Sequence, residues 1–158
     1  IAHEVAIGSL MYTMLARDNN TVIVFDLDDA LSFAGRAAPY LQYAHARACR
    51  ILERAGDIPQ GIITFEDMQE EEIDLIDHIG NFPLEVENAA ESYRPLEIAD
   101  YVYELARKFN DFYADFDKRP VLTAPEPQRT MRVALVAATR QTLANGLGLL
   151  GVAAPEVM

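Results

Sequence analysis

The amino-acid sequence predicts an all-α protein, a helical bundle with one short extended segment near residues 21–25. Most of the chain carries apolar residues at helical spacing, in segments that begin near proline and end near glycine. Only the stretch 21–25, which reads TVIVF, is rich in β-branched residues, and a sheet needs several such strands. Because 51% of the 158 residues are hydrophobic and 24% are charged, we expect one soluble domain with its own core.

Composition also restricts the partners of the chain. No apolar run reaches the roughly 20 residues that cross a bilayer, so we expect no membrane partner. The lone Cys49 excludes an internal disulfide, which favours a reducing, cytoplasmic location. The net charge of −12 disfavours DNA as a ligand, but residues 57–100 alone contain thirteen acidic residues and one basic residue. The remainder of the chain is neutral, so its surface is free to bind an anion.

Local signals predict the first two helices. Residues 1–17 show a mostly apolar stripe, and the polar run 18–20 ends this helix. Asp26 follows the extended segment and is a good N-cap for a short helix over 27–33, which ends at Gly35. The stripe of the first helix consists of Val5, Leu10, Met11, Met14 and Leu15.

Prolines and glycines delimit the later helices. One helix begins near Pro39 and continues to residue 55, with Gly56 just beyond its end, and residues 57–71 form a loop. The remaining helices are expected at 72–79, at 83–93, at 95–116, and from Pro125–Pro127 to residue 146 or 150.

Two short motifs resemble catalytic signatures, and neither has the required context. The stretch 21–33 resembles the opening of haloacid-dehalogenase-type phosphatases, but these need a parallel sheet to present a nucleophile such as Asp26. Residues 78–81, His-Ile-Gly-Asn, resemble the nucleotide-binding signature of class I aminoacyl-tRNA synthetases, which must open a helix so that its N-terminus meets phosphate. Here they follow an acidic helical stretch. We therefore interpret Asp26 as a helix cap and Gly80 as lying past a helix end.

The segment 35–56, GRAAPYLQYAHARACRILERAG, has two distinct faces when it is drawn as a helix. The apolar face consists of Leu41, Ala44, Ala48, Ile51, Leu52 and Ala55, and the second stripe consists of Tyr40, Tyr43, Arg47, Arg50 and Arg54. Two interpretations fit this second stripe. Either the tyrosines half-bury against a neighbouring helix and the arginines are solvated, or the rings stack on unpaired RNA bases and the arginines contact phosphates or base edges.

The pattern G-x-x-A-P-Y-L-Q-Y-A-H-A-R at 35–47 resembles the opening helix of the anticodon-binding domain of arginyl-tRNA synthetases. The similarity extends to residues 7–17 and 22–33, to ADYVYELARKFNDFY, and to the C-terminal segment that ends GLLGVAAPEVM. The resemblance implies a helical bundle of the class I synthetase anticodon-binding type over 21–158, which contains the acidic segment 57–100. It also implies that residues 1–20 form a helix joining this domain to the catalytic region.

The resemblance further implies an activity for the longer protein. Members of this family attach arginine to its tRNA with ATP and Mg²⁺, in a catalytic domain that lies upstream. This chain would then be a fragment of an arginine–tRNA ligase that is inactive alone and carries no catalytic residue, metal site or cofactor of its own. Its implied partners are the anticodon loop of the arginine-accepting tRNA and the catalytic domain of the same chain.

The resemblance also implies which residues bind RNA. Tyr40 and Tyr43 would stack on splayed bases, and Arg47 would contact a base or the backbone. Main-chain atoms of Met158 would help to read the central cytidine of the anticodon, beside Val157, where the family often has arginine. Further candidates for tRNA contact are Tyr113, Arg50, Arg129 and Arg132, for which a core or solvated surface position is the alternative.

A second class of function stays open at this point. The chain could be a helical protein–protein interaction module, in which the acidic segment 57–100 docks a basic partner and the tyrosines only pack. In the RNA-binding interpretation that segment faces away from the RNA. Gln42 and His45 also match the family motif, and their role is either structural or in RNA contact.

Overall fold

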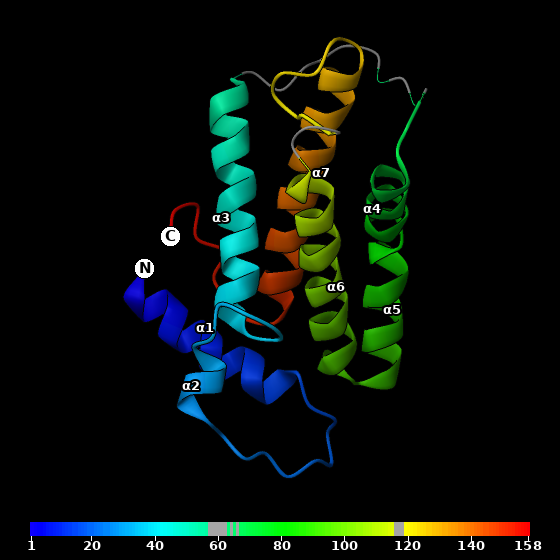
Figure 1. Cartoon of the computed structure of the whole chain (residues 1–158). Helices are drawn as coiled ribbons and strands as arrows, with labels where there is room; N and C mark the ends of the chain where they lie inside the picture. The colour runs from blue at the N-terminus through cyan, green and yellow to red at the C-terminus, as the bar shows by residue number, and fades with distance from the viewer. Residues whose placement is uncertain (57–62, 64, 66, 116–118) are drawn as a thin grey trace.

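The computed structural model describes residues 1–56, 63, 65, 67–115 and 119–158. Within these ranges it contains helices and no strand, so the all-α prediction is confirmed (Figure 1). None of the described helices combines the length and the apolar character needed to cross a membrane. The helices are α1 (Ala2–Leu15), α2 (Leu27–Ala30), α3 (Ala38–Ala55), α4 (Glu70–Gly80), α5 (Phe82–Ser92), α6 (Pro95–Ala114) and α7 (Gln128–Leu149).

Helices α6 and α7 form the centre of the bundle. α3 packs against both of them and against α1, whereas α4 packs on α6 and α7, and α5 packs on α6 and α4. Figure 1 accordingly shows α3 on one side of the central pair and α4 and α5 on the other. The described part of the acidic segment 57–100 therefore lies mostly on the side of the bundle opposite α3.

The two faces predicted for α3 are observed. The helix has Pro39 in its first turn and ends at Ala55, and it is followed by Gly56, whose φ of 77° lies in the left-handed region that glycine tolerates. On the apolar face, Leu41, Ala44 and Ala48 are fully buried in the core. The opposite face carries the tyrosine and arginine stripe and is open to solvent at several positions.

The buried face of α1 differs from the sequence-based prediction. The helix ends at Leu15, and its buried residues are Gly8, Ser9 and Tyr12 rather than the predicted stripe. Leu10, Met11 and Met14 of that stripe are exposed. Because α1 is apolar around most of its circumference, helical periodicity could not identify the face that packs.

The segment between α1 and α3 is only partly as predicted. Asp26 caps α2, since its Oδ1 accepts hydrogen bonds from the backbone N–H groups of Asp28 and Asp29 at 2.9 and 3.0 Å. The helix ends at Ala30 rather than at residue 33, because Ser32 Oγ bonds to the backbone of Ala34 and forms a competing local turn. Residues 21–25 have no regular secondary structure.

Other helix ends differ from the prediction by a few residues. α4 begins at Glu70, inside the predicted loop 57–71, because the backbone N–H of Gln69 donates to Glu72 Oε2 at 2.7 Å and so helps to cap the helix. The rest of that loop lies largely outside the described residues. α6 ends at Ala114 rather than at 116.

His78 has a structural role at the end of α4. Its ring stacks on the Tyr101 ring with centroids 4.3 Å apart, and Tyr101 Oη donates to the His78 carbonyl at 2.7 Å. Gly80 is the last residue of the helix rather than the first residue beyond it. Burial lowers the pKa of the His78 imidazole. The synthetase-like signature at 78–81 is therefore a packed helix end.

The residues after α7 return along α3. Gly151, with a φ of 67°, turns the chain, and Figure 1 shows the C-terminus beside α3. Gln42 Nε2 donates to the carbonyl of Ala153 at 3.0 Å, and His45 Nδ1 donates to the carbonyl of Pro155 at 2.9 Å. Both side chains are buried, so Gln42 and His45 hold the C-terminal tail, residues 152–158, against α3.

We expect acidification to destabilise the fold through His45. Burial lowers the pKa of its imidazole below the ordinary value of 6.5, so the unfolded chain becomes protonated there before the folded chain does. The stabilising contribution is complete above the unfolded-state pKa and decreases as the pH falls through it. Between about pH 7.5 and 5.5, the urea midpoint of the wild-type chain should fall more steeply than that of His45→Gln.

The matched control for this experiment is His3→Gln, because His3 is exposed on α1. Its urea midpoint should follow the wild-type pH dependence. If the wild type and His45→Gln had equal slopes, protonation of His45 would not be coupled to folding.

We also expect that the approach of α7 to α6 depends on Gly146. A Cβ at Gly146 would overlap Cγ2 of the buried Val102, whereas a Cβ at Gly148, two residues further along α7, would meet nothing within 4 Å. Gly146→Ala should lower the free energy of unfolding by about 1–3 kcal/mol through overpacking. Gly148→Ala should leave it unchanged or raise it by up to about 1 kcal/mol, because alanine favours helix. Chemical denaturation measures both, and equal effects would contradict the packing argument.

Candidate nucleic-acid interface

A hollow of about 330 Å³ lies where the open face of α3 meets the end of α6 and the C-terminal tail. Its lining residues come from three separate parts of the chain, and we refer to it as the α3 pocket. They are Tyr43, Ala46, Arg47, Arg50, Ile51, Arg54, Tyr113, Val157 and Met158. The structure therefore brings together most of the residues that the sequence indicated for RNA contact.

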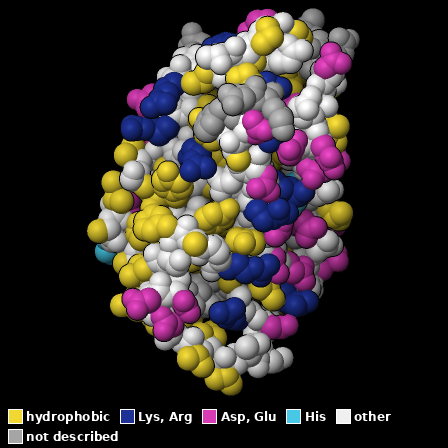
Figure 2. All heavy atoms as spheres, viewed as in Figure 1, with side chains coloured by type: hydrophobic (Ala, Val, Ile, Leu, Met, Phe, Trp, Pro, Cys, Tyr) yellow, Lys and Arg dark blue, Asp and Glu magenta, His cyan; other side chains and the backbone are white. Residues whose placement is uncertain are grey.

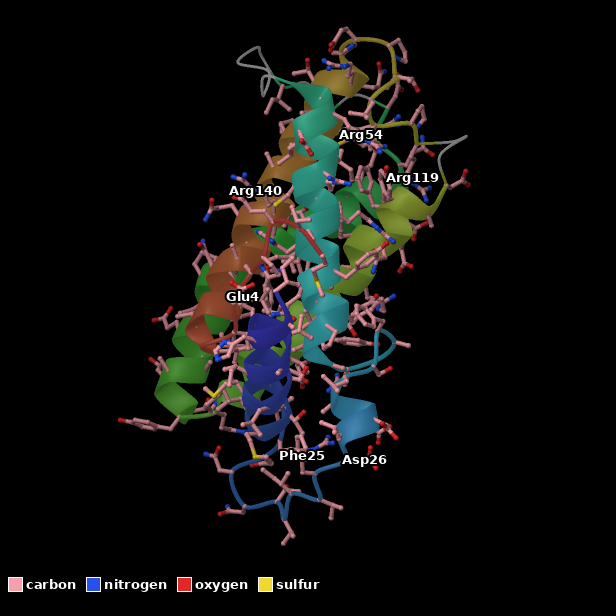
Figure 3. All side chains as sticks on the ribbon, turned by 90° about the vertical axis from the view of Figure 1, so that its left-hand side faces the viewer. Glu4, Phe25, Asp26, Arg54, Arg119 and Arg140 are labelled. Carbon is pink, nitrogen blue, oxygen red and sulfur yellow. The ribbon has the colours of Figure 1, made fainter. Side chains whose placement is uncertain are left out.

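The position of each wall follows from local structure. Residues 43, 47, 50 and 54 are three or four positions apart, so they line one face of α3. Tyr113 comes from the last turn of α6, and Met158 comes from the tail that Gln42 and His45 hold. Figure 3 shows Arg54 on α3 near one end of the molecule, and Asp26 near the opposite end. The phosphatase-like motif is thus remote from the pocket.

Arg47 is the most constrained of the arginines in the α3 pocket. Its guanidinium carbon lies 4.8 Å from the centroid of the Tyr43 ring and 6.0 Å from that of the Tyr113 ring. Its Nη1 donates to Asn110 Oδ1 at 2.7 Å. Stacking on the rings and this hydrogen bond place the charge between α3 and α6.

Tyr40 does not line the α3 pocket. It lies one turn before Tyr43, is partly buried, and packs against the Tyr103 ring of α6 with centroids 5.9 Å apart. Its hydroxyl accepts a hydrogen bond from Asn110 Nδ2 at 2.8 Å. The structure therefore separates the two tyrosines that the sequence placed in one stripe.

The electrostatic character of the pocket is positive. Three of its lining residues are arginines, and none of the lining residues that the structure describes has a carboxylate side chain. The carboxylate of Glu53 is 3.9 Å from Arg50, but both side chains are exposed, so water screens this pair strongly. Figure 2 shows Lys and Arg side chains at the upper left, over the α3 side, while Asp and Glu side chains are dense on the right, over α4 and α5.

Arg129 and Arg132 lie outside the α3 pocket, so the structure does not bring these two candidates together with the others. Arg132 is only 6% exposed, and its Nε donates to the fully buried Glu72 Oε1 at 2.6 Å. Arg129 donates to the carbonyls of Leu122 and Ala55, at 3.3 and 3.1 Å. Their donors are occupied within the fold because the start of α7 is covered by α4 and by the segment before it.

Tyr113 of α6 was a candidate from the sequence, but Asn110 and Tyr103, which adjoin the same region, were not. Asn110 lies three positions before Tyr113, and Tyr103 lies seven before Asn110, so all three share one face of the predicted helix. That spacing was a usable signal. Helical periodicity does not show which helix packs against this face of α6. The contacts of Asn110 and Tyr103 with α3 were therefore not predicted.

Comparisons with known proteins show the family of this chain. Residues 41–158 match the family model of the DALR anticodon binding domain. The chain is 41% identical over 168 residues to the arginine–tRNA ligase of Pyrococcus furiosus, and 37% identical over 177 residues to that of Halorubrum lacusprofundi. These alignments cover 100% of this chain but 26% and 29% of the two ligases.

A solved structure gives the same result. The arginyl-tRNA synthetase of Thermus thermophilus superposes with a TM-score of 0.92 at 40% identity, over 99% of this chain and 27% of that one. The chain thus spans about a quarter of the length of the relatives it matches. The resemblance seen in the sequence is confirmed, and the chain belongs to the family of DALR anticodon-binding domains.

Proposed function

We propose that this chain is the anticodon-recognition part of an arginine–tRNA ligase, and that the α3 pocket binds unstacked bases of the anticodon loop. The observation that carries the proposal is the pocket itself. It combines aromatic rings and guanidinium groups from three parts of the chain, in a fold whose solved relative at 40% identity is an arginyl-tRNA synthetase. Rings and arginines are the side chains with which proteins hold single-stranded RNA.

Each wall of the pocket has a distinct chemical role. The half-exposed Tyr43 ring offers a stacking platform, and stacking on an aromatic side chain contributes about 1–3 kcal/mol per base. Arg50 and Arg54 extend along α3 as contacts for successive phosphates. Arg47, fixed near the rings, presents its remaining N–H groups to a base edge or phosphate.

Met158 supplies the recognition of the central cytidine. The exocyclic amino group of cytidine is a hydrogen-bond donor and needs an acceptor. A main-chain oxygen of Met158 would meet this need, since Met158 lines the pocket beside Val157. The buried anchors Gln42 and His45 keep this part of the tail in place.

The proposed activity belongs to the longer protein rather than to this chain alone. Attachment of arginine with ATP and Mg²⁺ would take place in a catalytic domain within the part of the relatives that this chain does not cover. The chain's partners would then be arginine tRNA and that catalytic domain, in the cytoplasm. By this proposal the isolated chain binds tRNA but does not form arginyl-tRNA.

The alternative of a protein–protein interaction module is not supported by the comparisons, which match anticodon-binding domains and arginine–tRNA ligases. The acidic helices also lie mostly across the bundle from the pocket. They would repel RNA from the wrong side of the domain and leave the α3 side as the attractive surface.

We expect this chain to bind an arginine-tRNA anticodon stem-loop more tightly than the same stem-loop with the central cytidine changed to uridine. Tyr43→Ala should weaken binding by about fivefold to a hundredfold, since the stacking platform is lost. Fluorescence anisotropy with labelled stem-loops at two salt concentrations measures both effects, and binding should weaken modestly with salt because few phosphates are contacted.

Tyr93→Ala is the control, because Tyr93 is an exposed tyrosine just after the end of α5, away from the pocket. It should bind the stem-loop as the wild type does. Equal affinity for the cytidine and uridine loops, with no effect of Tyr43→Ala, would contradict the proposed anticodon site.

A further inference from the structure

We propose that Asn110 is a positioning residue for anticodon binding, which holds the Arg47 guanidinium in the α3 pocket, and that Tyr40 acts through Asn110 rather than by stacking on a base. The inference rests on the proposed function for its link to RNA. The contacts themselves belong to the chain without RNA. They therefore allow a test that is independent of tRNA.

The side-chain amide of Asn110 joins the two helices. Its Oδ1 accepts from Arg47 Nη1 at 2.7 Å, and its Nδ2 donates to Tyr40 Oη at 2.8 Å. An arginine has donors only, so it selects the oxygen end of the amide. The NH₂ end is then directed to the Tyr40 hydroxyl, which can accept. If the amide were flipped, its NH₂ group would face the N–H donors of Arg47. Arg47 therefore fixes the orientation of the Asn110 amide, and Tyr40 accepts from the NH₂ group in that orientation.

Tyr40 is fixed from its other side. Its ring contacts the Tyr103 ring, and the Arg36 guanidinium lies over the Tyr103 ring, 5.0 Å from the centroid of that ring. Arg36 in turn pairs with Asp100 at 2.6 Å. Because the Tyr40 ring is packed here and does not line the pocket, its hydroxyl is the group that connects it to the site.

The consequence is a preorganised Arg47. An arginine side chain has many rotamers, and fixing them during binding costs free energy. In this chain the hydrogen bond to Asn110 and the contact with the Tyr43 ring fix the guanidinium before RNA arrives. Its other N–H donors are left to the ligand. Arg50, whose Glu53 partner is 3.9 Å away and exposed, has no comparable restraint among the described contacts.

The first experiment is a double-mutant cycle on stem-loop affinity. Asn110→Ala and Tyr40→Phe should each weaken binding by about threefold to tenfold, as expected for a hydrogen bond that orients a charged group. In an Arg47→Ala background, both should change affinity by less than about twofold, because the group they position is gone. Additive losses in that background would overturn the proposal. So would a Tyr40→Phe chain that binds like the wild type while Tyr40→Ala loses affinity, which would assign the role to the ring.

The second experiment uses no RNA. In the free chain, NMR of the Arg47 side-chain N–H groups should show a restrained guanidinium in the wild type and a mobile one in Asn110→Ala. Asn110→Asp should keep the restraint, since a carboxylate accepts from Arg47 and the Tyr40 hydroxyl can reverse to donate. Asn145→Ala, which removes an exposed asparagine on α7, is the matched control and should leave the Arg47 signals unchanged.

The two experiments separate the two proposals. A restrained Arg47 that is released by Asn110→Ala, in a chain that fails to bind any stem-loop, would uphold the role of Asn110 in holding Arg47 and contradict the proposed function. An Arg47 that is equally mobile in the wild type and in Asn110→Ala would overturn the Asn110 assignment, whatever the affinity for RNA.

Discussion

The hydrogen bonds from the buried Gln42 and His45 to the C-terminal tail are the interaction on which the α3 pocket depends. These donors are three residues apart on α3, and they meet the carbonyls of Ala153 and Pro155, two residues apart in the tail. Neighbours at that helical spacing are about 5–6 Å apart, a distance that two residues of non-helical chain can span. The tail has no regular secondary structure, so these side chains replace the partners that a helix or strand would supply.

This arrangement lets one helix contribute both to the core and to the proposed binding surface. The same turns of α3 bury Leu41 and Ala44, hold the tail through Gln42 and His45, and expose Tyr43. Residues at 41, 42, 43 and 45 differ in direction by the 100° steps of a helix, so each function has its own sector. Any shift of α3 along the bundle would disturb all three sectors together, which is why the packing of α6 and α7 behind it matters for the site.

The distribution of charge over the bundle also distinguishes the α3 side from the side of α4 and α5. The acidic helices α4 and α5 lie mostly across α6 and α7 from α3, and the arginines of the pocket face the other way (Figure 2). The chain as a whole is strongly negative, yet the lining of the α3 pocket carries three arginines. Net charge therefore describes solubility and long-range repulsion, while the local field at the pocket governs how an RNA approaches.

Part of this structure could be predicted from the sequence. The faces of α3 were predictable because apolar residues repeat at 3.6-residue spacing between Pro39 and Gly56, and the local cap at Asp26 needed no knowledge of the fold. The buried face of α1 could not be predicted, since a helix that is apolar around most of its circumference has no polar face to contrast with a buried one. The pairing of Arg132 with Glu72 could not be predicted either, because it joins residues 60 positions apart in the sequence. Within the candidate site, the stripe was visible, but the separation of Tyr40 from Tyr43 depends on how α6 packs against α3.

The most direct test of the proposed RNA-binding surface is a backbone NMR titration of the chain with an arginine-tRNA anticodon stem-loop. Amide signals should move along residues 43–54 of α3, near Tyr113, and at residues 157–158, while those of α4 and the middle of α5 stay unchanged. Shifts confined to the acidic helices, or to the exposed apolar residues of α1, would contradict the assignment of the α3 pocket as the anticodon-binding surface.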